Sequence, residues 1–288
     1  MYQMRLLPIR RYDLEVVILV ALSVTCSHGT TVIVVVASNG IVLASDSKQT
    51  TASHVANPKP AIKAHVINDR VAVAVVGAAD LEIFADSKTV FSYHTVEFLQ
   101  GIKDSSPADA SVSAVVAIIR DKSHTAMNGL TPYMANGFFD EKKAPAGNLI
   151  DYIVVGYEQG VPSVVRISIK PDWEARKLSA PVIKTIHPSQ DTPPSGADIR
   201  FYGVTQAIQN AALPGSTEQG AALARYPGVI RGLEVRRNGL IIDASEAAVV
   251  AADLIRLQAE FDSNDVGLPV NLLTVFDGKR PTVISISK

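Results

Sequence analysis

The chain contains very little cysteine, tryptophan or net charge. Its 288 residues include one cysteine and one tryptophan, and 27 basic against 28 acidic residues leave a net charge of −1. The single cysteine, Cys26, excludes an internal disulfide framework and a cysteine-based metal site. The balanced charge provides no basic surface for nucleic acid and no basic helix for a membrane surface. We therefore expect no nucleic-acid partner.

Clustered histidines and long apolar runs are lacking as well. The six histidines are scattered with no pair at i, i+4, so we expect no metal site. No feature of the sequence requires an organic cofactor. The apolar run Val16–Val24 is too short to cross a bilayer, so no stable membrane span is predicted. A hydrophobic content of 47% is nevertheless enough for a sizeable core.

The first 29 residues resemble a removable leader. Arginines precede Val16–Val24, which has the length and character of a signal-peptide core. The small residues Ser27 and Gly29 occupy the −3 and −1 positions relative to Thr30. Acidic residues abut the apolar run, which is unusual for an export signal, so a propeptide and an over-extended start are rival interpretations. We expect residues 1–29 to be removed. The protein is then periplasmic or secreted if they form a signal peptide, and cytoplasmic otherwise.

The remainder, residues 30–288, is expected to form one domain that begins with a β-hairpin. Val32–Val36 and Ile41–Ala44 are nearly continuous apolar runs on either side of Asn39-Gly40, the strongest short hairpin signal. Continuous rather than alternating runs predict strands that are covered on both faces. With Asn39-Gly40 as the turn, Asp46 would pair opposite Ile33, and direct contact with Thr30 is not expected.

Further strands are predicted at residues 71–76, 150–156, 164–170, 270–276 and 282–286. Helical spacing of apolar residues predicts helices over about 79–100, 199–212 and 245–261, the last with Ser245 as its N-cap. Residues 108–120 suit either a strand or a helix. Groups of hairpin-built strands between helices favour an α+β fold of antiparallel sheets with helices on their outer faces.

Thr30 is the residue with the clearest chemical potential. It directly follows Gly29 at the start of the first strand, and Asp46 ends the second. If the Gly29–Thr30 bond is cut, Thr30 supplies both an attacking hydroxyl and a free α-amine that can act as its general base. Such an amine has a reference pKa of about 7.7–8.0. A nearby lysine would lower that pKa, and a carboxylate would hold the lysine in position.

Four segments carry a resemblance to a known family. Residues 29–48 resemble the opening of a catalytic β-type subunit of the proteasome-type threonine hydrolases, a branch of the N-terminal nucleophile (Ntn) hydrolases. Residues 63–80 are similar to the family's lysine strand, turn and glycine. Residues 150–157 resemble its central buried strand, and residues 266–271 the entry to its late strand. The resemblance implies a four-layer αββα sandwich of two antiparallel sheets flanked by helices.

The resemblance also implies roles for particular residues. Thr30 matches the nucleophile, Asp46 the carboxylate and Lys63 the lysine. Gly77 matches the residue whose backbone N–H helps to hold the oxyanion. Gly29 and Thr30 form the cleavage site.

Two segments depart from the family pattern. The family's late Asp and Ser fall on Ser263 and Val266, and the neighbouring Asp262 and Asp265 are candidate substitutes. Asp262, Ser263 and Asp265 are therefore possible auxiliary residues. The nearest match to the family's Gly-Ser-Gly segment is Ser195-Gly196.

The resulting hypothesis is a threonine-type endopeptidase or amide hydrolase that acts through an acyl-enzyme intermediate. Its substrate would be a peptide or protein, and the family implies a homo-oligomer. Two alternatives stay open at the level of sequence. One is a catalytically silent structural or interaction subunit with the same fold, and the other is an Ntn amidohydrolase that acts on a small amide.

Overall fold

The computed structural model describes residues 30–48, 62–78, 80–85, 88–137, 139–141, 147–188 and 196–286. Residues 1–29, with Gly29 and the predicted leader, lie outside the described residues. The interpretation of that segment therefore stays a prediction.

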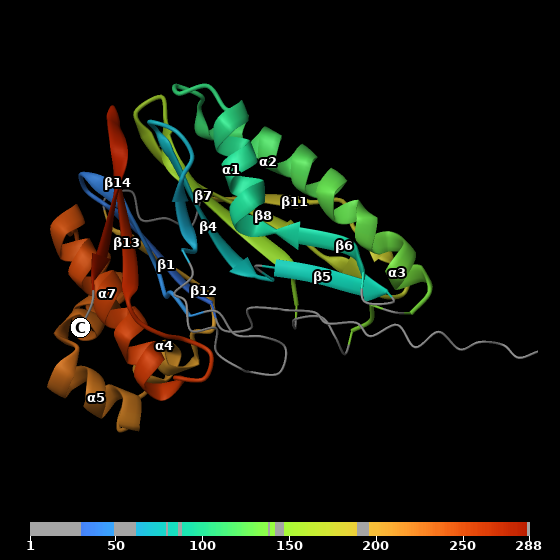
Figure 1. Cartoon of the computed structure of the whole chain (residues 1–288). Helices are drawn as coiled ribbons and strands as arrows, with labels where there is room; N and C mark the ends of the chain where they lie inside the picture. Colours follow the sequence, from blue (N-terminus) through green and yellow to red (C-terminus); the bar gives the residue numbers. More distant parts are fainter. Residues whose placement is uncertain are drawn as a thin grey trace, which may run out of the picture.

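Two five-stranded antiparallel sheets pack face to face in the middle of the molecule (Figure 1). The first sheet has the order β12 (Asp198–Gly203), β1 (Thr31–Ala37), β2 (Gly40–Ser45), β13 (Val270–Phe276) and β14 (Lys279–Ile286). The second has the order β11 (Val182–His187), β8 (Val161–Ile169), β7 (Ile150–Glu158), β4 (Val71–Gly77) and β3 (Ala64–Val66). Two small hairpins are added, β5 (Asp80–Ala85) with β6 (Lys88–His94) and β9 (Pro171–Asp172) with β10 (Lys177–Leu178).

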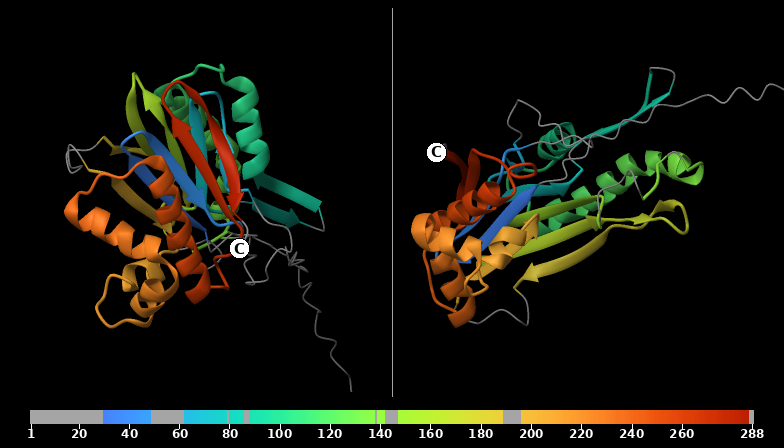
Figure 2. Two further views of the ribbon diagram at one scale, coloured as in Figure 1. Left: turned by 90° about the vertical axis from the view of Figure 1, so that its left-hand side faces the viewer. Right: turned by 90° about the horizontal axis from the view of Figure 1, so that it is seen from below.

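Helices cover the outer face of each sheet (Figure 1, Figure 2). The second sheet is covered by α1 (Thr95–Ser105), α2 (Val112–Met127), the 3₁₀ turn η1 (Asn128–Leu130) and α3 (Thr131–Ala135). The first is covered by α4 (Gln206–Asn210), α5 (Thr217–Arg225), α6 (Pro227–Asn238) and α7 (Ala244–Phe261). The predicted αββα sandwich is thereby confirmed.

None of the helices in the described ranges is both long enough and apolar enough to cross a membrane.

The core is divided into three layers of apolar side chains, one between the sheets and one under each helical layer. Every residue of β1 and β2 is buried, because the hairpin has the second sheet on one face and α7 on the other. This explains the continuous apolar runs in the sequence. The layer between the sheets includes small side chains, Ala64, Ala72 and Ala74, which allow a close approach of the two sheets.

The hairpin β1–β2 has a different turn from the predicted one. Its two-residue turn is Ser38-Asn39, with Ala37 paired to Gly40, so the register is shifted by two residues. The side chain of Asn39 accepts a hydrogen bond from the backbone N–H of Ala244 at 2.8 Å, which ties the turn to the start of α7. A Cβ at position 40 would lie 2.9 Å from the ring of Phe276, so Gly40 belongs to the packed strand.

The helix predicted over residues 79–100 is wrong up to residue 94. Residues 80–85 and 88–94 form the paired strands β5 and β6, which project beyond the second sheet (Figure 2), and α1 begins only at Thr95. Leu81 and Ile83 are buried while Glu82 between them is half-buried, which is the two-residue period of a strand. The apolar spacing fits both periods over so short a run, and packing against the core selects the strand.

The helix predicted over residues 199–212 is also wrong in its first half. Residues 198–203 form β12, which pairs with β1, and only the short helix α4 follows. Helices α5 and α6 were not predicted. The ambiguous residues 108–120 contribute to α2, whose N-cap Ser111 accepts from the N–H of Ala114. Helix α7 is capped by Asp243, which accepts from the N–H of Glu246 at 2.8 Å, and Ser245 lies inside the helix.

Candidate active site

Thr30 lies immediately before β1, beside the end of β12. The backbone N–H of Val204 donates to the carbonyl oxygen of Thr30 at 3.0 Å, and the hydroxyl of Thr31 donates to the carbonyl oxygen of Val204 at 2.6 Å. Gly203 has φ +81°, and a Cβ there would lie 1.7 Å from the Thr30 carbonyl oxygen. The backbone at Thr30 is therefore held by a segment about 170 residues later in the chain, at a position that accepts only glycine.

Asp46 lies beside Thr31, because the observed register continues past the last strand pair, Val32 with Ser45. The backbone N–H of Thr31 donates to Asp46 Oδ1 at 2.8 Å, and the N–H of Asp46 donates to the Thr31 carbonyl at 3.1 Å. The expected pairing of Asp46 with Ile33 is thus wrong by two residues, because the turn is Ser38-Asn39 and not Asn39-Gly40. The carboxylate is in direct contact with the backbone next to Thr30.

Two further backbone groups bind the same carboxylate. The N–H of Lys48 donates to Oδ2 of Asp46 at 3.0 Å, and the N–H of Gly267 donates to it at 3.4 Å. Asp46 is fully buried. A buried carboxylate requires such donors, because burial removes it from water.

Lys63 completes this arrangement from the other sheet. Its ammonium lies 3.1 Å from Oδ1 and 3.0 Å from Oδ2 of Asp46, and the side chain is 4% exposed. The carbonyl of Lys63 accepts from the N–H of Val75 at 3.0 Å, so the residue is held beside β4, just before β3 begins. The lysine therefore reaches across the gap between the two sheets.

Burial acts on both members of the pair. It raises the pKa of Asp46, against the opposing effects of the Lys63 cation and of the N–H groups of Thr31 and Lys48. It lowers the pKa of Lys63, against the opposing effect of Asp46, and the Lys48 cation lowers that pKa further. A lysine with a lowered pKa gives up its proton more easily, which suits a group that takes part in proton transfer.

Gly77 ends β4 on the same hairpin as Lys63. It has φ +100°, and a Cβ there would lie 2.5 Å from the carbonyl oxygen of Leu149. The N–H of Ala78 donates to that same carbonyl at 2.9 Å. The backbone thus requires glycine at this position, and the role of its N–H toward an oxyanion stays a prediction.

The late segment approaches the site through its backbone. Asp262, Ser263 and Asp265 lie in the turn between α7 and β13, where the N–H of Asp265 donates to the Asp262 carbonyl at 3.2 Å. Burial and the nearby Asp265 carboxylate raise the pKa of Asp262. In this turn the group in contact with Asp46 is the N–H of Gly267. The auxiliary roles of the three side chains stay predictions.

The structure brings a segment to Thr30 that the sequence did not indicate. Gly196 lies at the opposite end of β12 from Gly203, where a Cβ would meet the Gly239 carbonyl oxygen at 2.7 Å. Ser195 lies outside the described residues. The segment beside Thr30 is instead Gly203-Val204, directly before α4. Gly203 lies between β12 and α4, whereas the sequence pattern predicted it inside a helix over residues 199–212.

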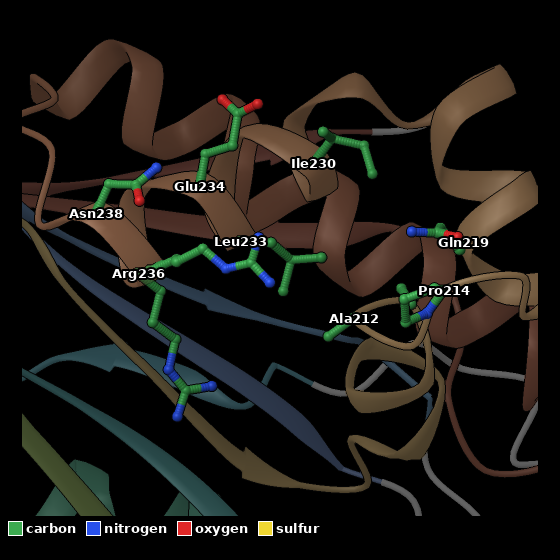
Figure 3. Close-up of a pocket in the computed structure, with 10 residues that line it drawn as sticks. Ala212, Pro214, Gln219, Ile230, Leu233, Glu234, Arg236 and Asn238 are labelled. Carbon is green, nitrogen blue, oxygen red and sulfur yellow. The ribbon is translucent and has the colours of Figure 1, made fainter.

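No metal-binding cluster marks the site among the described residues, and one cavity of the molecule lies elsewhere. No group of three His, Cys, Asp or Glu side chains in these ranges could hold a metal ion. A cavity of about 660 Å³ lies in the outer helical layer, between the α4–α5 segment and α6 (Figure 3). Its lining includes Ala212, Leu233 and Arg236 and none of the predicted catalytic residues.

Residues 26–146 match the family model described as "Proteasome subunit". The resemblance to the proteasome family is confirmed. The matched stretch contains Thr30, Asp46, Lys63 and Gly77, whereas the late segment lies beyond it.

Two other comparisons add context. A solved structure titled "Anbu (Gly-1) mutant from Hyphomicrobium sp. strain MC1" is similar at 14% sequence identity and a TM-score of 0.47, over 90% of this chain and 89% of that chain. No curated protein matches the chain in sequence. The two antiparallel sheets between helical layers agree with the fold that the family match implies.

Proposed function

We propose that the protein is a threonine-dependent amide hydrolase of the proteasome type that cleaves peptide bonds after removal of residues 1–29. The observation that carries this proposal is the buried pair of Lys63 and Asp46, 3.0 Å apart, bound to the backbone of Thr31. A buried ion pair costs desolvation energy, so its place beside a strand-start threonine favours a chemical role over a stabilising one.

The proposed reaction has two steps. The Thr30 hydroxyl oxygen attacks the substrate carbonyl carbon, and its proton passes to the free α-amine of Thr30. The C–N bond of the substrate breaks, the departing amine takes the proton, and an ester to Thr30 remains. Water then hydrolyses the ester with the α-amine as base. Lys63 lowers the pKa of the α-amine, Asp46 holds Lys63, and the N–H of Gly77 binds the oxyanion.

Release of Thr30 is part of the proposal. In the uncut chain Thr30 is buried, with 2% of its surface exposed, so we place the cut before catalysis. Attack by the Thr30 hydroxyl on the Gly29 carbonyl, followed by hydrolysis of the resulting ester, would leave a Gly29 carboxylate and a free Thr30 amine. The mature protein is then residues 30–288, a single domain. A signal peptidase is the rival agent of the cut, and it would place the protein in the periplasm or outside the cell.

The alternatives remain distinct in their consequences. A catalytically silent subunit is favoured by the late segment, where Ser263 and Val266 stand at the positions of the family's Asp and Ser. An amidohydrolase would keep the chemistry and take a small amide. Homo-oligomer formation belongs to the main proposal, because proteasome-family members form oligomers.

The first test follows the fate of the Gly29–Thr30 bond. We expect the purified parent protein to begin at Thr30 in N-terminal sequencing and in intact mass, and Thr30→Ala to retain residues 1–29. Thr125→Ala, which removes an exposed hydroxyl bonded to Asp121, serves as the matched control and is trimmed like the parent. Trimming of Thr30→Ala at the same bond would assign the cut to another protease.

A second measurement separates the functions. The trimmed protein is assayed against a panel of fluorogenic peptides and against small acyl amides. Turnover of peptides that Thr30→Ala lacks supports the peptidase, and turnover of small amides alone supports the amidohydrolase. A parent chain that still begins upstream of Gly29 and turns over neither class would contradict the enzyme and leave the silent subunit.

A further inference from the structure

Lys48 connects three parts of the site. Its backbone N–H donates to Oδ2 of Asp46 at 3.0 Å. Its side-chain ammonium donates to the carbonyl oxygen of Ser263, on the turn between α7 and β13. The same residue thus contacts the carboxylate through its backbone and the late turn through its side chain, 215 positions away.

The stem of Lys48 also packs against this turn. A Cβ at Gly267 would lie 2.8 Å from Cβ and 3.1 Å from Cδ of Lys48, so the two residues are in close contact and glycine is required. The backbone of Gly267 is bonded on both sides, since its carbonyl accepts from the N–H of Ser47 at 3.3 Å and its N–H donates to Asp46 at 3.4 Å. Four contacts therefore join the segment Asp46–Lys48 to the late turn.

We propose that Lys48 is a positioning residue that fastens the turn of residues 262–269 to Asp46, and thereby sets the place of Asp46 and of Lys63 for catalysis. This inference rests on the proposed function. In this inference Lys48 supports the site through its contacts with the turn. The resemblance implied such support from the side chains of Asp262, Ser263 and Asp265.

Charge provides a second reason for the assignment. Among the described residues, the charged groups that act on Lys63 are Asp46 and Lys48, and the Lys48 cation also acts on the Asp262 carboxylate in the turn, where it opposes the rise in that pKa. The Lys48 cation disfavours the protonated form of a neighbouring amine. A freed α-amine at Thr30 would join the same group. Loss of the Lys48 charge should therefore raise the pKa of Lys63 and of that amine together.

The experiment compares Lys48→Met, Lys48→Gln and Lys48→Arg in the full chain. Lys48→Met keeps most of the stem and removes the charge and the donor, Lys48→Gln keeps a donor without charge, and Lys48→Arg keeps both. Lys122→Met is the matched control, because it removes an exposed ammonium that donates to Ser105 on the surface. Turnover of fluorogenic peptides is measured from pH 6 to 10, together with far-UV circular dichroism.

For Lys48→Met we expect kcat to fall roughly tenfold or more at a nearly unchanged KM, because the reacting groups lose their alignment. We also expect the pH profile of kcat/KM to move to higher pH by roughly half to one unit. Lys48→Arg should restore the parent's kcat and pH profile. Lys48→Gln should show the same shift of the pH profile, which tests the charge even if Lys48→Met does not fold. Lys122→Met should resemble the parent in both measurements.

Two results overturn the inference and can be told apart from failure of the proposed function. If Thr30→Ala is inactive and the neutral variants at position 48 keep the parent's kcat and pH profile, the role of Lys48 is wrong and the proposed function stands. A shift of the profile to lower pH leads to the same conclusion. If Thr30→Ala keeps the parent's activity, or the parent has none, the proposed function fails and the inference fails with it.

Discussion

At the residue scale, the candidate site depends on two glycines and one ion pair. Lys63 and Asp46 are both buried, and desolvation of two charges offsets much of their attraction. Their stability as a pair requires the surrounding backbone donors to stay in place. Gly203 and Gly77 allow the chain to come close enough for this, because each has a positive φ and no space for a side chain.

The first prediction concerns Gly203. Gly203→Ala should destabilise the protein by about 2–4 kcal/mol, since it combines a strained φ with displacement of the Thr30 carbonyl. Gly215→Ala is the matched control, because Gly215 has φ +78° and nothing within 4 Å of the added Cβ. Gly215→Ala should lose only the part of the stability that comes from the strained φ, about 1–2 kcal/mol. Urea unfolding measures both, and equal losses would contradict the clash with Thr30.

The residues predicted from sequence are those that lie in a short opening segment or match a family motif. Thr30, Asp46 and Lys63 were identified in this way, and the structure places Lys63 on Asp46 beside Thr31. Gly203 and Lys48 were missed as parts of the site, because their partners lie about 170 and 215 positions away in sequence. No local pattern encodes such a contact.

At the scale of elements, local periodicity predicted seven strands of the sandwich, β1, β2, β4, β7, β8, β13 and β14, and failed where a segment fits two periods. Val32–Val36 was predicted correctly, because a continuous run of β-branched residues that is covered on both faces favours a buried strand. Residues 80–85, 88–94 and 199–203 were assigned to helices and lie in strands. Their pairing partners decide the outcome, β6 for β5 and β1 for β12, and pairing is a tertiary property.

The second prediction tests the contact between β6 and β7. The hydroxyl groups of Tyr93 and Tyr152 are buried and hydrogen-bonded to each other. Burial raises the pKa of both, and the neighbouring Tyr152 hydroxyl raises that of Tyr93 further. Above pH 10 the unfolded chain loses tyrosine protons that the folded chain keeps, so stability should fall with rising pH.

The expected slope is at most about 1.4 kcal/mol per pH unit for each tyrosine between pH 10 and 11. Tyr93→Phe combined with Tyr152→Phe should flatten it relative to the parent, and the two proteins should have parallel curves from pH 7 to 9. Urea unfolding at each pH gives the free energies. A double variant with the parent's slope above pH 10 would show that these two groups do not carry the effect.

At the scale of the whole molecule, the two sheets share one core, and we expect residues 30–288 to unfold as one unit. The single tryptophan, Trp173, packs against Phe139 with ring centroids 5.7 Å apart and reports on the layer outside the second sheet. Circular dichroism reports on all helices. The urea transitions from tryptophan fluorescence and from circular dichroism should coincide. Separate midpoints would contradict a single domain.

The location of Lys63 has a mechanical consequence. Thr30 and Asp46 adjoin β1 and β2 of the first sheet, whereas Lys63 precedes β3 and Gly77 ends β4 of the second. The proposed nucleophile and the proposed oxyanion donor therefore lie on opposite sheets. The small side chains of Ala64, Ala72 and Ala74 pack between those sheets and keep them close. The distance between these two groups therefore depends on how closely the two sheets pack. A larger side chain at Ala72 or Ala74 would push the two sheets apart and widen the site without replacing any of its residues.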